Sequence, residues 1–261
     1  MVEINESRCV GCGACAADCV GGNLVVEEGK ARVKGGCILC GHCVALCPVQ
    51  AVAIPEYGPA QEMPGDAVSL DQEVLLQAIR SRRSIRQFRE LPVEREKMER
   101  MAEAGRYTAT AKNLQDTGVV FVQRELAELK RRVWAFIDAI PHSREQRPPR
   151  ELLPYMAFNR RRKSNPADDF LFRNAPAVLF VTSPRALDAG MAAQNMELMA
   201  EAQGLGVLFD GYLAHIAEAN RELKQWLGIG EETIQACLLL GYPQVRYRRT
   251  APRKEARTVW R

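Results

Sequence analysis

The sequence lacks the features of a membrane protein or a nucleic-acid-binding protein. No apolar run approaches the roughly 18 residues that a membrane-spanning helix needs. The chain begins with acidic residues and has no basic and apolar leader, so we expect no secretory signal. A formal net charge of +4 over 261 residues is too small to favour nucleic acid as a partner. We therefore expect a protein that binds neither a membrane nor a nucleic acid.

Two glycine-rich nucleotide-binding motifs are also missing. The chain has no G-x-G-x-x-G after a strand, as dinucleotide-binding folds have, and no G-x-x-x-x-G-K-[ST] of a P-loop. Those glycines let the backbone approach phosphates closely, so their absence disfavours both folds. The composition, with 47% hydrophobic and 26% charged residues, is otherwise that of an ordinary globular protein.

Cysteine is concentrated near the start of the chain. Eight of the nine cysteines precede residue 50, in two runs of spacing C-x2-C-x2-C-x3-C that lie 28 positions apart. In such a run, three thiolates of a tight loop bind one [4Fe–4S] cluster and the fourth binds the other cluster. The spacing therefore predicts two clusters. The expected ligands are Cys9, Cys12, Cys15 and Cys47 for one cluster, and Cys37, Cys40, Cys43 and Cys19 for the other.

Zinc sites and disulfides are the alternatives for these cysteines. Zinc sites usually pair C-x2-C units across longer loops, and an unsecreted chain should not rely on disulfides. Residues 1–57 resemble bacterial two-cluster ferredoxins, although Val20 stands where that family usually has the proline that Pro48 supplies in the second run. The resemblance implies an electron-transfer module, and its oxygen-sensitive clusters suggest a cytoplasmic protein. We expect His42 to be a bystander and Cys237 to be a buried structural thiol.

The remaining residues predict a larger second domain. Residues 58–69 contain prolines and glycines without an apolar period and indicate a linker, which leaves 70–261 for that domain. Helices outnumber strands and do not alternate with them one for one, so we expect an α+β fold and not a doubly wound sheet. In residues 1–57 the expected elements are a hairpin at 24–33 and a strand at 51–54. In the second domain they are helices at 70–85 (N-cap Asp71), 93–104, 126–140, 189–202 and 216–227 and strands at 119–122, 177–182, 207–209 and 234–240.

Four short segments of the second domain carry recognisable motifs. They are Arg82-Arg83-Ser84-Ile85-Arg86, Asn113-x-Gln115, Gly204-Leu205-Gly206 to Asp210-Gly211, and Gly241-Tyr242-Pro243 followed by Arg246-x-Arg248-Arg249. In this order and spacing, residues 70–261 resemble the nitroreductase family of FMN-dependent enzymes. The resemblance implies a sandwich in which helices flank a sheet. It also implies a homodimer with FMN at the subunit interface, and the tail at 245–261 fits an arm that wraps the partner.

The resemblance also implies a role for each segment. The first segment would bind the FMN phosphate, because guanidinium groups and a hydroxyl suit its charge. Arg248 or Arg249 would close that site from the C-terminal side. The Asn113 turn would bind the ribityl chain or the pyrimidine edge, and the Asp210-Gly211 amide would lie near N5. For the arginines alone, a solvated helix end is the alternative. The candidate FMN-binding residues are Arg82, Arg83, Ser84, Arg86, Asn113, Gln115, Asp210, Gly211, Arg248 and Arg249.

Together the two parts predict an iron–sulfur flavoprotein oxidoreductase. The clusters would pass single electrons to FMN, which would reduce a nitroaromatic, a quinone or a related electrophile by hydride transfer. The alternatives are reductive dehalogenation or ene-type reduction on the same scaffold, or a non-catalytic electron carrier or redox sensor. Expected partners are the small-molecule acceptor and an external donor such as ferredoxin, flavodoxin or NAD(P)H. No catalytic residue is assigned, and Lys112 and Tyr155 are guesses for a proton source.

Residues 141–174 are rich in arginine and include the run Arg160-Arg161-Arg162-Lys163. Their pattern favours a solvated, partly ordered loop. The functional alternative is a lid over the flavin that attracts an anionic substrate.

Overall fold

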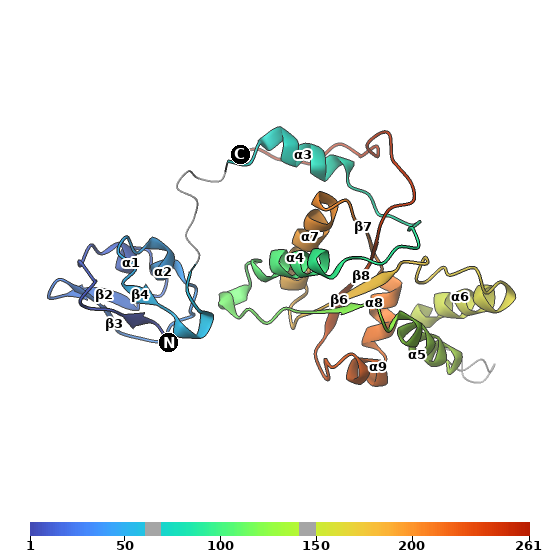
Figure 1. Ribbon diagram of the computed structural model, residues 1–261, viewed down its shortest axis with the longest axis horizontal. Helices are drawn as coiled ribbons and strands as arrows, with labels where there is room; N and C mark the ends of the chain where they lie inside the picture. Colours follow the sequence, from blue (N-terminus) through green and yellow to red (C-terminus); the bar gives the residue numbers. More distant parts are fainter. Residues whose placement is uncertain (61–68, 141–149) are drawn as a thin grey trace. The chain divides into compact units, whose positions relative to one another are not determined.

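The computed structural model describes residues 1–60, 69–140 and 150–261, and its contacts divide the chain into two units. The first unit comprises Met1–Leu70 and Thr110–Leu114, and the second comprises Asp71–Ala109 and Gln115–Arg261. Figure 1 labels the elements of both. The expected linker at 58–69 falls mostly outside the described residues, so its bounds stay a prediction. No helix of the described ranges is both long and apolar enough to cross a membrane.

The first unit repeats one structural motif. Each of its two short helices follows a glycine, Gly13 or Gly41, with a φ of 78°. Glycine adopts this left-handed conformation without strain. Since the two glycines lie 28 positions apart, the repeat in sequence is also a repeat in structure. The elements are β1 (Glu3–Ile4) paired with β4 (Val52–Ala53), the expected hairpin of β2 (Leu24–Glu27) and β3 (Lys30–Val33), helices α1 (Ala14–Ala17) and α2 (His42–Leu46), and the 3-10 turn η1 (Pro55–Tyr57).

The second unit is built on a four-stranded antiparallel sheet with the order β5-β6-β8-β7. The central strand β6 is buried along its whole length. Its alternate residues enter two different cores: Val178 and Phe180 pack with α5, α6, α8 and α9, whereas Leu179 and Val181 pack with α4 and α7. Helices therefore cover both faces of the sheet (Figure 1), which confirms the expected α+β sandwich. The strands are β5 (Gly118–Val122), β6 (Ala177–Thr182), β7 (Gly206–Phe209) and β8 (Ile234–Gly241).

Most expected helices are present. Two of them differ from expectation in their bounds, and a third helix lies where a loop is expected. Asp71 caps the first helix as expected, because its Oδ1 accepts the amide hydrogens of Glu73 and Val74. The helices are α3 (Gln72–Ser81), α4 (Arg95–Arg106), α5 (Leu126–Asp138), α6 (Leu153–Ser164), α7 (Ala186–Ala202), α8 (Gly211–Glu218) and α9 (Arg221–Trp226), with 3-10 turns η2 (Ala111–Asn113) and η3 (Arg150–Leu152).

The three differences have local physical causes. The first helix ends at Ser81 instead of Ile85, because the Ile85 amide donates to the Val207 carbonyl of β7 at 2.9 Å. The single helix expected at 216–227 is two helices, because Asn220 caps α9 by accepting the Leu223 amide at 3.0 Å. The expectation of a loop throughout 141–174 is wrong for the residues that form α6, and 141–149 lie outside the described residues.

The segment after α3 lies along the edge strand β7. Ser84 bridges to Val207, and Phe88 bridges to Pro243, which follows β8. A Cβ atom at Gly206 would lie 2.4 Å from Ile85 Cγ1, so only glycine fits there without a shift. The first and last of the four motif segments are thus held against β7.

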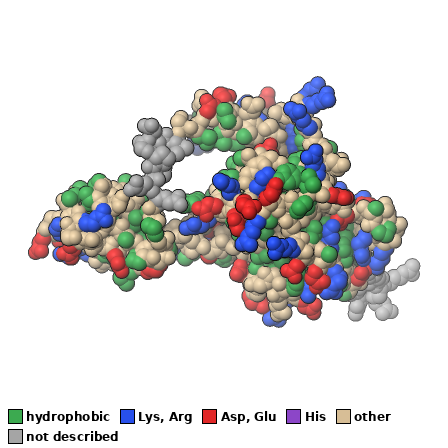
Figure 2. Space-filling view, in the orientation of Figure 1, with side chains coloured by type: hydrophobic (Ala, Val, Ile, Leu, Met, Phe, Trp, Pro, Cys, Tyr) green, Lys and Arg blue, Asp and Glu red, His purple; other side chains and the backbone are tan. Residues whose placement is uncertain are grey.

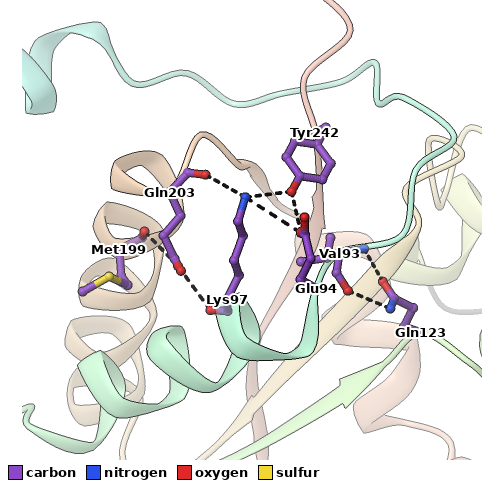
Figure 3. A network of polar contacts seen from close by, with 7 residues as sticks. All are labelled: Val93, Glu94, Lys97, Gln123, Met199, Gln203 and Tyr242. Atoms are coloured by element: carbon purple, nitrogen blue, oxygen red, sulfur yellow. Dashed lines mark hydrogen bonds and ion pairs between the residues drawn. The ribbon is translucent and has the colours of Figure 1, made fainter.

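A polar network joins the start of α4, the end of α7 and the residues after β8 (Figure 3). Lys97 Nζ donates to Tyr242 Oη at 2.7 Å and to the Gln203 carbonyl at 3.2 Å, and the Tyr242 hydroxyl donates to Glu94. The bond to Tyr242 lowers the pKa of the Glu94 carboxyl and raises the pKa of the Lys97 ammonium. Tyr242 of the Gly-Tyr-Pro motif therefore stabilises both charges.

We expect Tyr242→Phe to lower the unfolding temperature most at neutral pH. A lowered carboxyl pKa stabilises the fold only above that pKa, and a raised ammonium pKa stabilises it only below. The difference from the wild type should therefore shrink as pH falls below the ordinary Glu94 value of 4.5 and as it rises above the ordinary Lys97 value of 10.5. Tryptophan fluorescence reports on this unit, which contains all three tryptophans. Tyr107→Phe, at an exposed tyrosine, is the control, and a difference independent of pH would contradict the assignment.

Candidate functional site

Two small hollows in the first unit are lined by thiols. The first is lined by Cys9, Cys12, Cys15 and Cys47, and the second by Cys19, Cys37, Cys40 and Cys43, with Cys15 also at its border. These are the two sets that the spacing predicts. All nine cysteines are free thiols.

Backbone amides point at four of the sulfur atoms. Such N–H groups stabilise thiolates, the form that binds metals. They lower the pKa of Cys9 and of Cys19, whereas burial raises the pKa of Cys15 and of Cys43. The donors are Ala31 to Cys9 at 3.4 Å, Asn23 to Cys19 at 3.3 Å, Leu39 to Cys37 at 3.3 Å and Ala51 to Cys47 at 3.1 Å.

The arrangement of the thiols suits a polynuclear group. In the part of the chain that the structure describes, no three His, Cys, Asp or Glu side chains are grouped as ligands of one metal ion. A [4Fe–4S] cube spreads its thiolates over separate iron atoms, whereas zinc draws them to one ion. Four cysteine thiols are the donor set that a [4Fe–4S] cube takes, and each hollow is lined by at least four thiols. His42 borders the second hollow, and its Nδ1 lies 2.7 Å from Asp18 Oδ2.

A cavity of about 480 Å³ lies in the second unit, where β7 ends and α8 begins. Three of the candidate FMN-binding residues, Arg86, Asp210 and Gly211, line it. They come from the segment held against β7 and from the start of α8. The other lining residues are Glu151, Tyr155, Phe170, Leu171, Arg173, Leu208, Phe209, Tyr212 and His215.

Asp210 fixes the geometry at this cavity. Its amide donates to the Cys237 carbonyl of β8 at 2.8 Å, and its Oδ1 accepts the Leu213 amide at 2.8 Å, which caps α8. The side chain is 8% exposed, and burial raises its pKa, while the α8 amides and Arg173 oppose that shift. Cys237 is itself buried, as expected, and burial raises its thiol pKa.

Tyr155 of α6 connects two residues of α8 at the wall of the cavity. Its hydroxyl lies 2.8 Å from the Tyr212 carbonyl oxygen and 3.0 Å from His215 Nδ1. The Tyr155 side chain is 1% exposed, and burial raises its pKa well above the ordinary value of 10.0. The phenol is therefore a poor acid, although Tyr155 was a candidate proton source.

Arginine and aromatic side chains meet on one side of the cavity. Phe170 has the Arg161 guanidinium 4.6 Å and the Arg173 guanidinium 3.9 Å from its ring centroid. Burial lowers the pKa of Arg173. Arg173 and Arg86 line the cavity together with two acidic residues, Glu151 and Asp210, so the lining carries both signs of charge.

The basic run on α6 is mostly paired within the second unit. Arg161 lies 2.8 Å from Asp168, and Arg162 and Lys163 lie 3.2 and 2.6 Å from Asp138. On the face drawn in Figure 2, acidic and basic side chains are likewise interspersed over this unit. The hypothesis that residues 141–174 form a lid stays a prediction, since 141–149 lie outside the described residues.

The other candidate FMN-binding residues lie outside the cavity lining. Arg82 pairs with the buried Glu197 at 3.0 Å, and Arg83 donates to the Arg249 carbonyl at 3.2 Å, so it touches the exposed tail that also carries Arg248. Ser84 is held against Val207.

The Asn113 turn lies where the first unit meets the second in sequence: Asn113 belongs to the first unit and Gln115 to the second. The Asn113 amide donates to the carbonyls of Ile38 and Leu39 at 3.1 and 2.9 Å, within the first unit, to which Lys112 also belongs. Lys112, Asn113 and Gln115 all have a φ between 50° and 55°, a left-handed conformation that is uncommon outside glycine. Gln115, which belongs to the second unit, is not among the residues that line the cavity of that unit.

Sequence reasoning missed the residues that shape the cavity wall. Phe170 and Arg173 come from the segment after α6, and Tyr212 and His215 come from α8, so these residues meet only in the folded structure. One usable signal is the small number of histidines. The chain has three, and one of them, His215, immediately precedes the helix expected at 216–227.

Comparisons with known proteins identify both parts of the chain. Residues 79–242 match the model of the nitroreductase family, and residues 1–48 match that of the 4Fe-4S dicluster domain. A comparison with curated proteins found no match.

Solved structures share the fold of the second unit. A nitroreductase with bound FMN from Bacteroides fragilis is 19% identical, with a TM-score of 0.58 over 72% of this chain and 98% of its own. One with bound FMN from Desulfitobacterium hafniense is 20% identical, with a TM-score of 0.55 over 71% and 97%. An FMN-dependent nitroreductase from Clostridium difficile is 19% identical, with a TM-score of 0.53 over 73% and 99%. The chain therefore belongs to the nitroreductase family of oxidoreductases and carries a 4Fe-4S dicluster domain ahead of that fold.

Proposed function

We propose that this chain is an iron–sulfur flavoprotein reductase. Its first unit holds two [4Fe–4S] clusters on the eight cysteines of the repeat, and its second unit binds FMN. The observation that carries the proposal is the arrangement of eight thiols around two hollows in a chain that also has the nitroreductase fold. The C-x2-C-x2-C-x3-C spacing, present twice, favours [4Fe–4S] clusters over zinc at these hollows.

The proposed FMN site extends along β7. Two of the similar structures contain bound FMN, which supports this cofactor. Arg86, Asp210 and Gly211 lie at the cavity, and Arg83 and Ser84 lie beside β7 and the tail with Arg248 and Arg249. Arginine forks suit a phosphate. When bound, FMN accepts single electrons and returns two of them as a hydride.

The proposed reaction reduces a small electrophile such as a quinone or a nitroaromatic. Clusters exchange one electron at a time, so a flavin is needed to combine two electrons for such an acceptor. The electrons would come from an external ferredoxin, a flavodoxin or NAD(P)H, and the enzyme would work in the cytoplasm. The aromatic and arginine side chains at the cavity support a planar, polar acceptor.

The proposed enzyme is a homodimer. Helix α3 has no buried residue in the described chain, although Val74, Leu75 and Ile79 are apolar and are 62%, 37% and 45% exposed. An apolar helix face of this kind normally packs against another surface. A second copy of the chain would cover it.

Iron content tests the ligand assignment. We expect about eight irons per chain in anaerobically purified protein, and about four or fewer in Cys12→Ser. Cys237→Ala is the matched control, because Cys237 lies in the core of the second unit, and its iron content should equal that of the wild type. Metal analysis and sulfide determination give the counts. One or two zinc ions per wild-type chain, or full iron in Cys12→Ser, would contradict the assignment.

Electron flow is tested with a one-electron donor. Before any quinone is added, reduced ferredoxin should reduce the flavin rapidly in the wild type and in Cys237→Ala, but only slowly in Cys12→Ser combined with Cys40→Ser. Flavin that is reduced stoichiometrically with dithionite should still be reoxidised by 1,4-benzoquinone in all three proteins, because that half-reaction needs no cluster. Equal rates of flavin reduction with and without clusters would exclude the proposed route. Cluster and flavin reduction without turnover of any acceptor would favour a carrier or sensor.

Oligomeric state is tested on the face of α3. The wild type should sediment with twice the chain mass of 29.1 kDa, and Leu75→Glu with Ile79→Glu should shift it to the monomer and release FMN. Gln77→Glu adds a charge on the opposite face of α3 and should leave the dimer intact. A monomeric wild type that retains FMN would refute the dimer.

A further inference from the structure

Tyr155, Tyr212 and His215 form a hydrogen-bond arrangement that the proposed reaction does not yet use. The Tyr155 oxygen has two close partners, the Tyr212 carbonyl oxygen at 2.8 Å and His215 Nδ1 at 3.0 Å. Tyr155 comes from α6, and the two partners come from α8. His215 and Tyr155 both line the cavity of about 480 Å³.

The positions of the hydrogen atoms follow from the chemistry of these groups. A carbonyl oxygen can only accept a hydrogen bond, so the single hydroxyl hydrogen of Tyr155 must lie toward Tyr212. The Tyr155 oxygen is then an acceptor toward His215, and His215 Nδ1 must carry a hydrogen. This arrangement assigns the Nδ1–H tautomer to neutral His215. The other ring nitrogen, Nε2, has no hydrogen-bond partner among the residues that the structure describes, and it is therefore the ring atom that is available to a bound molecule.

We propose that His215 is a catalytic acid, which donates the proton on Nε2 to the acceptor while that acceptor is reduced in the cavity, and that Tyr155 is its positioning residue. This inference rests on the proposed function. Reduction of a quinone to a hydroquinone adds one hydride and one proton, and reduction of a nitro group to a nitroso group and water adds the same pair. Bound FMN would supply the hydride, and His215 supplies the proton. The neutral ring that remains still donates its Nδ1–H to Tyr155, so its orientation is unchanged.

The surroundings of His215 support this role. The charged residues on the same cavity lining are Arg86, Arg173, Glu151 and Asp210, two of each sign. Tyr155 packs beside the ring with a centroid distance of 5.9 Å and is nearly fully buried. Burial raises the pKa of Tyr155, so the phenol keeps its proton and acts as a fixed support. Water at the cavity can return a proton to Nε2 after each turnover.

The tautomer is tested by NMR, independently of activity. The chain has three histidines, so ¹⁵N-histidine labelling of the full-length protein gives three ring systems, and His215→Asn identifies the one of interest. At alkaline pH we expect the Nδ1–H pattern for His215, and we expect Tyr155→Phe to convert it to the mixture in which Nε2–H is common. An Nε2–H pattern in the wild type would overturn the proposal.

The acid role is tested in the half-reaction that follows flavin reduction. Protein reduced stoichiometrically with dithionite is mixed with 1,4-benzoquinone, and flavin reoxidation is followed against pH. The rate for His215→Asn should fall about 100- to 10,000-fold, as when a general acid is lost, and its profile should lose the alkaline fall of the wild type. The asparagine amide can still donate to Tyr155, so folding and FMN content should be kept, and His215→Gln provides a second variant. Tyr155→Phe should lose about tenfold, since one orienting hydrogen bond is removed.

The outcomes separate this inference from the proposed function. If reduced wild-type flavin is not reoxidised by any acceptor, the proposed function fails. If it is reoxidised and His215→Asn and His215→Gln match the wild type in rate and in pH profile, the proposed function stands and the role of His215 is refuted. The control is Tyr107→Phe, at an exposed tyrosine of the same unit that does not line the cavity, and it should leave this half-reaction unchanged.

Discussion

The cavity of the second unit depends on the burial of Asp210. Its backbone amide bonds to Cys237 of β8, and its carboxylate caps α8 through Leu213. The residue therefore joins the last strand of the sheet to the helix that forms the cavity wall. Because α8 starts at a fixed point and in a fixed direction, the Tyr212 carbonyl and the His215 ring meet the same Tyr155 hydroxyl. A buried carboxylate is costly, but here it accepts amide hydrogens that would otherwise be unpaired.

Local patterns predicted much of the second fold. The run at 177–181 is apolar at every position, and together with Thr182 it forms β6 with helices on both faces, as a fully buried strand should. Asp71 signals a helix start by itself, because a cap acts within three residues. The α6 helix was not predicted because its basic run is charged at every position, and only the structure shows that these side chains pair with Asp138 and Asp168. Its apolar side is revealed only by packing.

The candidate FMN-binding residues were likewise predicted only in part. The motif after α3 predicted a cluster of positive charge, and the structure separates it because the chain becomes extended after Ser81. In an extended segment, alternate side chains point to opposite sides. Ile85 accordingly enters the core at 4% exposure, while its neighbour Arg86 reaches the cavity. Arg82 stands at the C-cap of α3, before the extended segment, and meets Glu197. The sequence shows the residues of the motif, but their separate destinations depend on β7 and α7, which are more than 100 positions away.

The repeat in the first unit has a further consequence. Each half of the repeat supplies three cysteines to one hollow and its last cysteine to the other: Cys19 lines the second hollow and Cys47 lines the first. With the proposed ligands, neither half can complete a cube alone, so the halves are interlocked through their metal groups. Loading of one hollow then orders the cysteine that the other hollow requires, and maturation of this unit becomes a cooperative process in which metal assembly and folding are one event.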